Sequence, residues 1–516
     1  MPSHAQLSRI LATARAGAPG EAWRLFREAG LEGERADPAV LAVRGRLLKE
    51  EARGAEGAAR AVLQGEAAEA YAAAGALSGA TYHLINAATL WRLAGDTDAA
   101  QAVAARVLDS LERNPDEAET PYWRGATRAE ALLLLGRRAE AAAALALAVK
   151  AGPQAWEDHA ATLRQFRLIC AAERCATAWL EVLTPPRAAH FAGHMAPADE
   201  ADLRARADEL LAQMPVGFAF GALAAGADIV IAEALADAGA ELNLVLPADP
   251  ATFRAISVDV HPGGWGERFD RLLDRAGSLQ AIGDGPPAPD ELSVALAAQI
   301  AMGEAARRAA ELETEAIQIV ALDPASQRRA TPGGAAWARD RWATARRRQF
   351  VLPAGRGRGV GAMAHAPTDV RLAAVLAIAI DPADVRAFAD AVASGPAPLT
   401  PPVWTGAGFS AVYAEGADAV RAAWIVIAAM GPRARIGGGY GRIRWQAPPQ
   451  VGPVATGAPA DAAAAILASV PAGAAHVSGR LGAVASVGVP ALRLTEVDER
   501  SAEDGVSAIF ALALPG

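Results

Sequence analysis

The stretch VGFAFGALAAGADIVIAEALADAGAELNLVLPAD, residues 216–249, decides the fold of the middle of the chain. Its apolar runs at 216–220 and 242–246 have the composition of strands, and residues 228–238 between them have that of a helix. Gly221 and Gly226 bound the turn before this helix, and Gly239 follows its end. Strand, helix and strand in this order form a βαβ unit, which predicts a parallel sheet with helices on both faces.

The flanking segments extend this pattern. AAHFAGHM (188–195) predicts a strand that ends in a glycine turn, and EAIQIVALDP (315–324) predicts another strand. Residues 199–213 and 265–276 predict helices. A glycine turn between a strand and a helix lets backbone N–H groups approach an anion at the helix N-terminus, so these turns are candidate ligand loops.

The segment GALAAGADIVIAEALADAGAELNLVLP also resembles the GGARGADRLA…A…G motif of SLOG-type Rossmannoid domains. Domains of this type bind or process nucleotides and their derivatives. The resemblance covers about 185–325 and implies two ligand loops. The residues implied in the first loop are Gly193, His194 and Met195, and those in the second are Gly221, Gly226, Ala227 and Asp228. The resemblance leaves His194 either a phosphate partner or a packing histidine. The GGxxGxM motif and the Arg–Glu pair of the hydrolases are absent, which favours binding over catalysis.

Residues 331–369 predict a linker after this domain. The segment RDRWATARRRQF (339–350) is basic, and PAGRGRGVGAMAHAPTD (353–369) is rich in glycine and arginine. Residues 357–362 fit a GxGxxA pattern, but the helix and the acidic partner of a dinucleotide site are missing.

The last third of the chain predicts mixed α and β structure. VLAIAIDPADVRAFADAV (375–392) begins with a strand, and VWTGAGFSAVYAEGADAVRAAWIVIAAM (403–430) reads as a hairpin followed by a helix. RARIGGGYGRIRW (433–445) reads as a strand with a glycine turn, and VGPVATGAPADAAAAILASVPAGAAHVSG (451–479) as turn, helix and strand. This order resembles the class III adenylate/guanylate cyclase domain across about 371–516, which implies an α+β, ferredoxin-like fold.

The residues at the cyclase site positions imply a degenerate site. In that family two aspartates bind the catalytic metal ions, and an asparagine and an arginine on one helix act on the ribose and the transition state. The resemblance places Asp381 and Ala407 at the metal positions, and Asp461 and Ala465 at the helix positions. Alanine can neither hold a metal nor supply a positive charge, so we expect no cyclase activity and no metal. Since active cyclases build their sites between two such domains, we also expect a homodimer through 371–516.

Residues 1–182 read as helical pairs separated by short breaks. YHLINAATLWRLAGDTDAAQAVAARVLDSL (82–111) and YWRGATRAEALLLLGRRAEAAAALALAVKAGP (122–153) each turn at a glycine between two helices. The pattern resembles tetratricopeptide repeats over about 60–155, and also the repeats in the TRAF-binding segment of some MAP kinase kinase kinases. It implies an α-helical solenoid, whose concave surface is either a docking groove for a protein or a scaffold packed against the chain itself.

Composition limits the function classes. The chain has 516 residues, is 52% hydrophobic and carries a formal net charge of −9, which argues for a globular protein and against nucleic-acid binding. No apolar run is long enough for a membrane span, and no secretory signal is evident, so a cytoplasmic protein is expected. Cys170 and Cys175 fall on one predicted helix, where this spacing points them to different faces as buried apolar residues.

These observations favour a three-part, non-catalytic sensor or scaffold: repeats at 1–182, a SLOG-like domain at 183–330, the linker at 331–369 and a cyclase-like domain at 370–516. A nucleotide-derived ligand would bind the middle domain, and a protein partner the repeats. The alternatives are a nucleotide-processing hydrolase or glycosidase at the middle domain, or a purely structural assembly protein.

Overall fold

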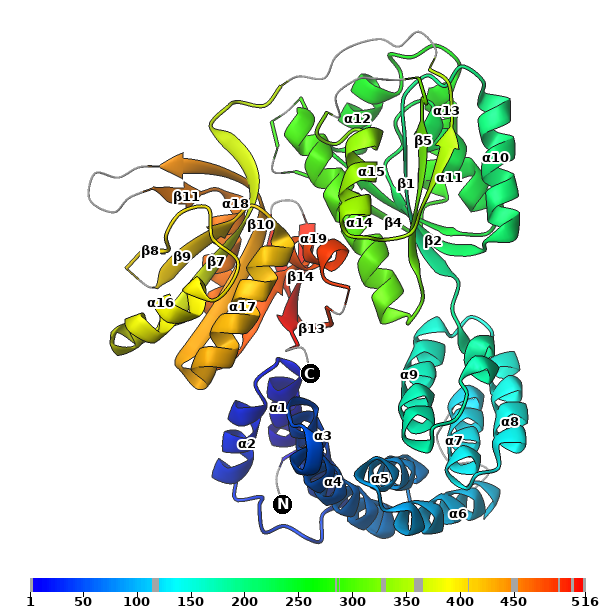
Figure 1. Cartoon of the computed structure of the whole chain (residues 1–516), viewed down its shortest axis with the longest axis vertical. Coiled ribbons are helices and arrows are strands. Elements are labelled where there is room, and N and C mark those ends of the chain that lie inside the picture. The colour runs from blue at the N-terminus through cyan, green and yellow to red at the C-terminus, as the bar shows by residue number, and fades with distance from the viewer. Residues whose placement is uncertain are drawn as a thin grey trace. The chain divides into compact units, whose positions relative to one another are not determined.

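The computed structural model describes residues 3–113, 120–283, 285–286, 288–325, 331–356, 365–406, 408–446, 453–490, 492–502 and 505–513. The chain divides into two compact units, with the boundary between Pro185 and Pro186 (Figure 1). No helix in these described ranges is both long and apolar enough to cross a bilayer.

The first unit consists of antiparallel helices that follow one another in an arc (Figure 1). Its elements are α1 (His4–Arg15), α2 (Pro19–Glu28), α3 (Pro38–Gly54), α4 (Gly57–Ser78), α5 (Thr81–Ala94), α6 (Thr97–Arg113), α7 (Pro121–Leu134), α8 (Arg138–Ala151), α9 (Trp156–Glu173) and the 3₁₀ helix η1 (Ala178–Leu183). Helices α5 and α9 lie on the inner side of the arc, and α6 and α8 on its outer side.

Small residues allow these helices to approach closely. Gly95 ends α5 with a φ of 96°, a left-handed conformation that favours glycine, and so makes the predicted turn into α6. A Cβ atom at Gly75 of α4 would lie 2.6 Å from Leu84 Cδ2 of α5, so a larger residue would displace the Leu84 side chain. Ala87 and Ala88, which the sequence placed where two helices meet, are fully buried.

The second unit begins with a six-stranded sheet in which all pairs are parallel, in the order β4-β3-β2-β1-β5-β6. Its strands are β1 (Arg187–Gly193), β2 (Val216–Gly221), β3 (Glu241–Leu246), β4 (Ser278–Ala281), β5 (Ala316–Leu322) and β6 (Gln349–Pro353). Its helices are α10 (Glu200–Gln213), α11 (Ala227–Asp237), α12 (Pro250–Ser257), α13 (Trp265–Asp274), α14 (Glu291–Glu311) and α15 (Ala335–Thr344). The predicted parallel α/β sheet is therefore present.

The strand order reverses between β1 and β5. The chain builds β2, β3 and β4 outward on one side of β1 and then returns to place β5 on the other side. Because such crossovers are right-handed, α10, α11 and α13 cover one face of the sheet and α14 and α15 the opposite face. Phe191 of β1 packs with the first group, whereas His190 stacks on Trp342 of α15, with ring centroids 6.2 Å apart.

The prediction of a linker at 331–369 is wrong for the first half of that range. Helix α15 forms there, and β6 extends the sheet. The indole of Trp342 is fully buried, and its Nε1–H donates to the carbonyl of Arg348 at 2.9 Å. Arg347 donates to the carbonyls of Ser486 and Val487 at 2.6 and 2.9 Å. Residues 357–362, with the GxGxxA pattern, lie outside the described residues.

The second sheet is mixed, in the order β8-β9-β7-β10-β12-β14-β13, with β11 also paired to β10. Its strands are β7 (Val370–Ile380), β8 (Val403–Trp404), β9 (Phe409–Tyr413), β10 (Ala434–Gln446), β11 (Val454–Thr456), β12 (Ala475–Ser478), β13 (Leu494–Ala502) and β14 (Gly505–Leu512). Its helices are α16 (Val385–Ala393), α17 (Gly416–Met430), α18 (Ala458–Leu467) and α19 (Gly479–Gly488), with short 3₁₀ turns at η2 (Pro382–Asp384) and η3 (Gly431–Arg433). Among the described residues of this sheet, β10 and β12 pair in parallel and the other pairs are antiparallel, which is consistent with an α+β fold.

The glycines of RIGGGYG form no turn, contrary to the sequence-based prediction. They lie inside the continuous strand β10, under α18. A Cβ atom at Gly437 would lie 2.2 Å from the carbonyl oxygen of Ala463, and one at Gly439 would lie 2.3 Å from that of Pro459. These glycines are therefore required by the close approach of a helix to the sheet rather than by a change of chain direction.

Polar and close-packed contacts join the two sheets within the second unit. Arg442 of β10 donates to both carboxylate oxygens of Asp290 at 2.6 and 2.7 Å, and both side chains are almost fully buried. The hydroxyl of Tyr440 donates to Gln299 Oε1 at 2.8 Å. Gly303 of α14 lies against the backbone of Ala483 in α19. The two predicted domains therefore share one compact unit.

Candidate functional site

The carboxyl edge of the parallel sheet is a candidate ligand site, because ligands of such sheets bind where the strand order reverses. Both predicted ligand loops lie at this edge, one after β1 and one between β2 and α11. A Cβ atom at Gly193 would lie 2.3 Å from Ala227 Cβ, so the end of β1 touches the start of α11. The backbone N–H of Ala227 donates to the carbonyl of His194 at 3.2 Å. The helix N-terminus is thus already contacted by the chain's own backbone.

Asp228 joins the two loops. One of its carboxylate oxygens accepts the N–H of Gly193 at 2.6 Å, and the other accepts the N–H of Ala224 at 3.2 Å. The side chain is buried, and this burial raises its pKa to about 7, although the two N–H groups act in the opposite direction. Both oxygens are therefore engaged in holding the fold.

His194 links the same edge to the end of β6. Its Nδ1 lies 3.0 Å from the carbonyl oxygen of Met195, and its Nε2 lies 2.9 Å from that of Ala354. The N–H of Ala198 donates to the carbonyl of Gly355 at 2.7 Å. We call residues 354–356 the strap, because this segment runs from β6 to the loop after β1. A phosphate at His194 would have to displace one of these contacts.

Gly226 lies in a buried turn rather than on the surface. It is buried, with a φ of 105°, and a Cβ atom there would lie 2.6 Å from the backbone nitrogen of Ala196 and 2.8 Å from Pro197 Cδ. A Cβ atom at Gly221 would lie 2.7 Å from the ring of Phe191. Both glycines are explained by packing of the chain on itself.

The cyclase positions carry no assembled site in the described residues. Asp381 is exposed after β7, and its Oδ1 accepts the N–H of Ala383 at 2.8 Å to cap η2. Asp461 is exposed in the first turn of α18, and Ala465 is half-buried on the same helix. Ala407 lies outside the described residues, although the hairpin on either side of it, β8 and β9, has the predicted form.

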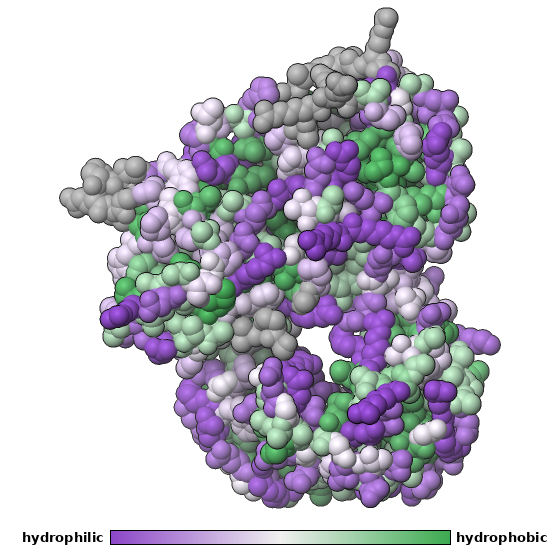
Figure 2. Space-filling model, viewed as in Figure 1, coloured by the Kyte–Doolittle hydropathy of each residue, from purple (hydrophilic) through white to green (hydrophobic). Residues whose placement is uncertain are grey.

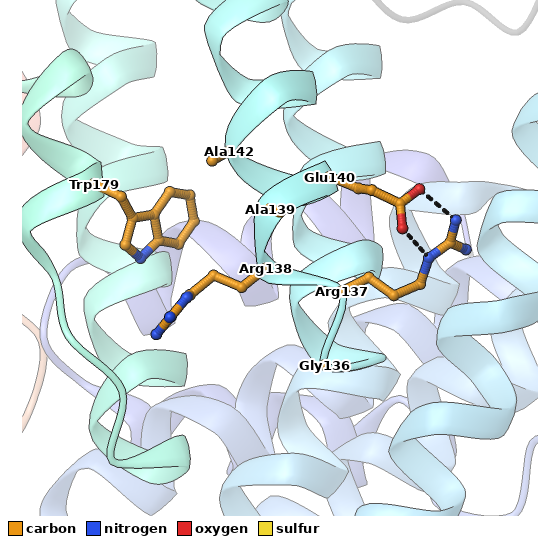
Figure 3. Close-up of a pocket in the computed structure, with 7 residues that line it drawn as sticks. All are labelled: Gly136, Arg137, Arg138, Ala139, Glu140, Ala142 and Trp179. Carbon is orange, nitrogen blue, oxygen red and sulfur yellow. Dashed lines mark hydrogen bonds and ion pairs between the residues drawn. The ribbon is translucent and has the colours of Figure 1, made fainter.

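Two hollows occur elsewhere. One, of about 470 Å³, is apolar and lies between α16 and residues 395–402, with Phe388 and Phe409 in contact at its base. The other, of about 400 Å³, lies between the start of α8 and Trp179 (Figure 3). There Arg137 and Glu140 pair with each other on the side away from Trp179, while Arg138 extends on the same side as the indole. Neither hollow brings together a set of polar groups that would orient a ligand.

In the first unit, aromatic and polar side chains share a surface on α5 and α7. Tyr82, Asn86 and Thr89 share one face of α5 by their i, i+4, i+7 spacing, and Trp123, Thr127 and Glu130 share one face of α7 in the same way. We call these six residues the α5–α7 face. Each residue on α7 follows its counterpart by 41 positions, so the two helices repeat the same surface.

Exposed aromatic side chains stand at one end of this face and buried polar groups at the other. Tyr82 is 53% exposed and Trp123 is 36% exposed. At the buried end, Thr89 Oγ1 donates to Glu130 Oε1 at 2.5 Å, and Gln165 Nε2 of α9 donates to the same oxygen at 3.0 Å. Elsewhere on the unit, hydrophilic residues are interspersed with small hydrophobic patches (Figure 2).

Burial disfavours the charged forms of two ionisable side chains, Glu130 in the face and Lys49 beside it. Burial raises the pKa of Glu130 and lowers the pKa of Lys49 on α3 to about 8, where the charge of Arg46 adds to the effect. Lys49 Nζ donates to Asn86 Oδ1 at 3.1 Å. In the described residues neither Lys49 nor Glu130 forms an ion pair. Burying such groups costs stability, which is typical of a binding surface.

Sequence reasoning did not identify this face. Tyr82, Trp123 and Glu130 fell within the predicted helical pairs without a role, and Lys49 was not singled out. The recurrence of an aromatic residue and two polar residues at equal spacing in YHLINAAT (82–89) and WRGATRAE (123–130) could have revealed it.

Comparison with known proteins supports helical repeats at the N-terminal end of the first unit. Residues 2–91 match the Tetratricopeptide Repeats-Sensor family, TPR-S. The match begins well before residue 60, where our sequence analysis placed the start of the resemblance, and it ends before α6. It includes Lys49 and the α5 half of the α5–α7 face.

Two solved structures are similar to part of the chain, and each covers 29% of it. One is the catalytic core of a rhodopsin-guanylyl cyclase with converted specificity in complex with ATPalphaS; it is 14% identical, covers 29% of this chain and 100% of its own, and has a TM-score of 0.23. The other is the guanylyl cyclase Cya2, which is 14% identical, covers 29% of this chain and 94% of its own, and has a TM-score of 0.23. No curated protein matches the chain.

Proposed function

We propose that this chain is a non-catalytic sensor or scaffold protein that docks a protein partner on the α5–α7 face. The observation that carries the proposal is the pair of exposed aromatic residues, Tyr82 and Trp123, at equivalent positions of successive repeats. Tyrosine and tryptophan supply most of the binding energy in many protein interfaces. The TPR-S match over residues 2–91, which includes α5 but not α7, supports a sensor role for the repeats.

The chemistry of the face defines the partner. The two aromatic rings offer anchors for apolar side chains of the partner. Lys49 donates one hydrogen bond to Asn86, while its ammonium carries three donors, so it can also donate to a carboxylate or carbonyl of the partner. The partner is therefore a protein segment with apolar anchors and an acceptor group placed to reach Lys49.

The partner can be isolated with the full chain as bait. Capture from an extract of the source cells, followed by quantitative mass spectrometry, compares the wild type with the double variant Tyr82→Ala, Trp123→Ala. The matched control is Val62→Ala, Leu147→Ala, which removes apolar side chains that are 59% and 66% exposed on α4 and α8. A protein that the control retains and the double variant loses is the partner. Equal capture by all three chains would count against docking at this face.

A second candidate function is binding of a nucleotide-derived ligand at the carboxyl edge of the parallel sheet. The reversal of strand order between β1 and β5 favours this place, and the SLOG resemblance of the sequence supports the ligand class. The strap and the contacts of His194 occupy the edge, so a ligand would bind as they move aside. A nucleotide that binds only the folded chain raises its unfolding temperature, which a thermal-shift screen measures. No shift with any nucleotide would favour a structural role for this sheet.

The cyclase-like region is proposed to be inactive. We expect no cyclic nucleotide from ATP or GTP with Mn²⁺, because Asp461 and Ala465 cannot supply the groups that their positions require in active enzymes. The measurement is product detection by mass spectrometry, with an active class III cyclase as the positive control. A product formed in repeated turnovers would overturn the assignment and favour an enzyme.

A further inference from the structure

The two cysteines meet where α9 ends. The helix stops at Glu173, and Arg174 takes a left-handed conformation with φ 54° and ψ 36°. The N–H of Cys175 then donates to the carbonyl of Cys170 at 2.9 Å. This is the arrangement in which the residue after the left-handed one folds back over the last helical turn. Our expectation that the two cysteines point to different faces is wrong, because the helix does not continue to residue 175.

The two thiols differ in access. The side chains of Cys170 and Cys175 lie close enough to interact electrostatically. Cys170 is fully buried, and Cys175 is partly exposed. Both pack in the same apolar cluster as Phe166 and Trp179. The Cys175 sulfur can therefore react with a reagent from solution, while the Cys170 sulfur lies behind it in the core.

We propose that Cys170 and Cys175 are a thiol modification site that closes to a reversible disulfide within the chain. The oxidant is a small disulfide such as oxidised glutathione. The Cys175 thiolate attacks one sulfur of the oxidant, which forms a mixed disulfide and releases one glutathione thiolate. The Cys170 thiolate then attacks the Cys175 sulfur and releases the second. Two electrons pass from the two cysteines to the oxidant, and the two protons leave with the released thiolates.

The second step is slow and depends on pH. Burial raises the pKa of the Cys170 thiol to about 12, so its thiolate is scarce near neutral pH. The rate of closure should therefore rise about tenfold for each unit of pH until the protein itself is affected. Closure would fix the last turn of α9 immediately before η1, the helix that leads out of the repeats.

The test uses the full chain with oxidised glutathione, quenched by iodoacetamide under denaturing conditions and analysed by intact mass and peptide mapping. At high pH we expect both thiols to be lost together, with Cys170 and Cys175 joined in one peptide pair, whereas near neutral pH glutathione should first appear on Cys175. The Cys170→Ser variant should retain glutathione on Cys175. The Cys175→Ser variant should react at least tenfold more slowly than the wild type and the Cys170→Ser variant, because only the buried thiol remains.

Several results would overturn the proposal. They are a stable mixed disulfide on Cys175 of the wild type at high pH, disulfide-linked pairs of chains, or loss of neither thiol. A rate of closure that does not change with pH would contradict the role of the buried Cys170 thiolate.

Discussion

The Gly226→Val variant is expected to lose more than about 4 kcal/mol of the free energy of unfolding of the second unit, enough to prevent its stable folding. The φ of 105° at this position is a conformation that a β-branched residue rarely adopts. A Cβ atom would also lie 2.6 Å from the backbone nitrogen of Ala196, which cannot move like the end of a flexible side chain. The result would show that the loop is a packed part of the fold.

The matched control is Gly239→Val. Gly239 also has a positive φ, 90°, but a Cβ atom there would meet open space, so only backbone strain remains. That strain costs about 1–2 kcal/mol. Thermal unfolding and hydrogen exchange on the amides of α11 measure both variants. Equal, small losses for the two would mean that the loops at Gly226 are loosely packed and open to a ligand.

Asp228 should make the second unit less stable as pH rises. Its pKa is 3.8 when unperturbed and about 7 in the folded chain, so the folded state holds the proton more tightly. A group of this kind contributes stability that is fully present below pH 4 and is lost as pH rises toward 7. At 1.36 kcal/mol per pKa unit, the difference in unfolding free energy between the wild type and Asp228→Asn should change by about 4 kcal/mol over this window.

Urea unfolding of both chains from pH 4 to pH 8 measures this change. Asp237→Asn serves as the control, because hydrogen bonds from Arg204 and Arg275 lower the pKa of Asp237. A lowered pKa gives stability that is present above the unfolded value and lost as pH falls, so this control should shift in the opposite direction. Its effect should be small since Asp237 is half exposed. Parallel pH profiles for the wild type and Asp228→Asn would show that the carboxylate is better solvated than its contacts indicate.

The βαβ core was predictable because its signals are local. Apolar strands, helices of ordinary length and glycine stops such as Gly239 lie next to one another in the sequence, and they mark β2, α11 and β3 within a residue or two. The same holds for the helical pairs that turn at Gly95 and Gly136. The order of strands in the parallel sheet, by contrast, depends on contacts between distant segments.

The features that the sequence did not reveal depend on contacts between distant segments or on an unusual helix end. The segment around Trp342 reads as a basic linker, but Trp342 fills a core position and Arg347 donates to carbonyls at the end of α19, 139 or more residues away. The contact between the cysteines was missed because Arg174 rather than glycine ends α9. The resemblance placed His194 and Asp228 in ligand loops, with His194 also open to a packing role, and the sequence cannot show that backbone groups from the strap and from β1 engage them.

Docking of a protein partner on the α5–α7 face, as proposed, can be measured by calorimetric titration of the captured partner into the full chain. We predict that the double variant Tyr82→Ala, Trp123→Ala binds at least about 30-fold more weakly than the wild type, because truncating a buried aromatic anchor costs more than about 1 kcal/mol. The control Val62→Ala, Leu147→Ala should bind within about twofold of the wild type, and circular dichroism should show all three chains folded. Equal affinities for the wild type and the double variant would contradict the account.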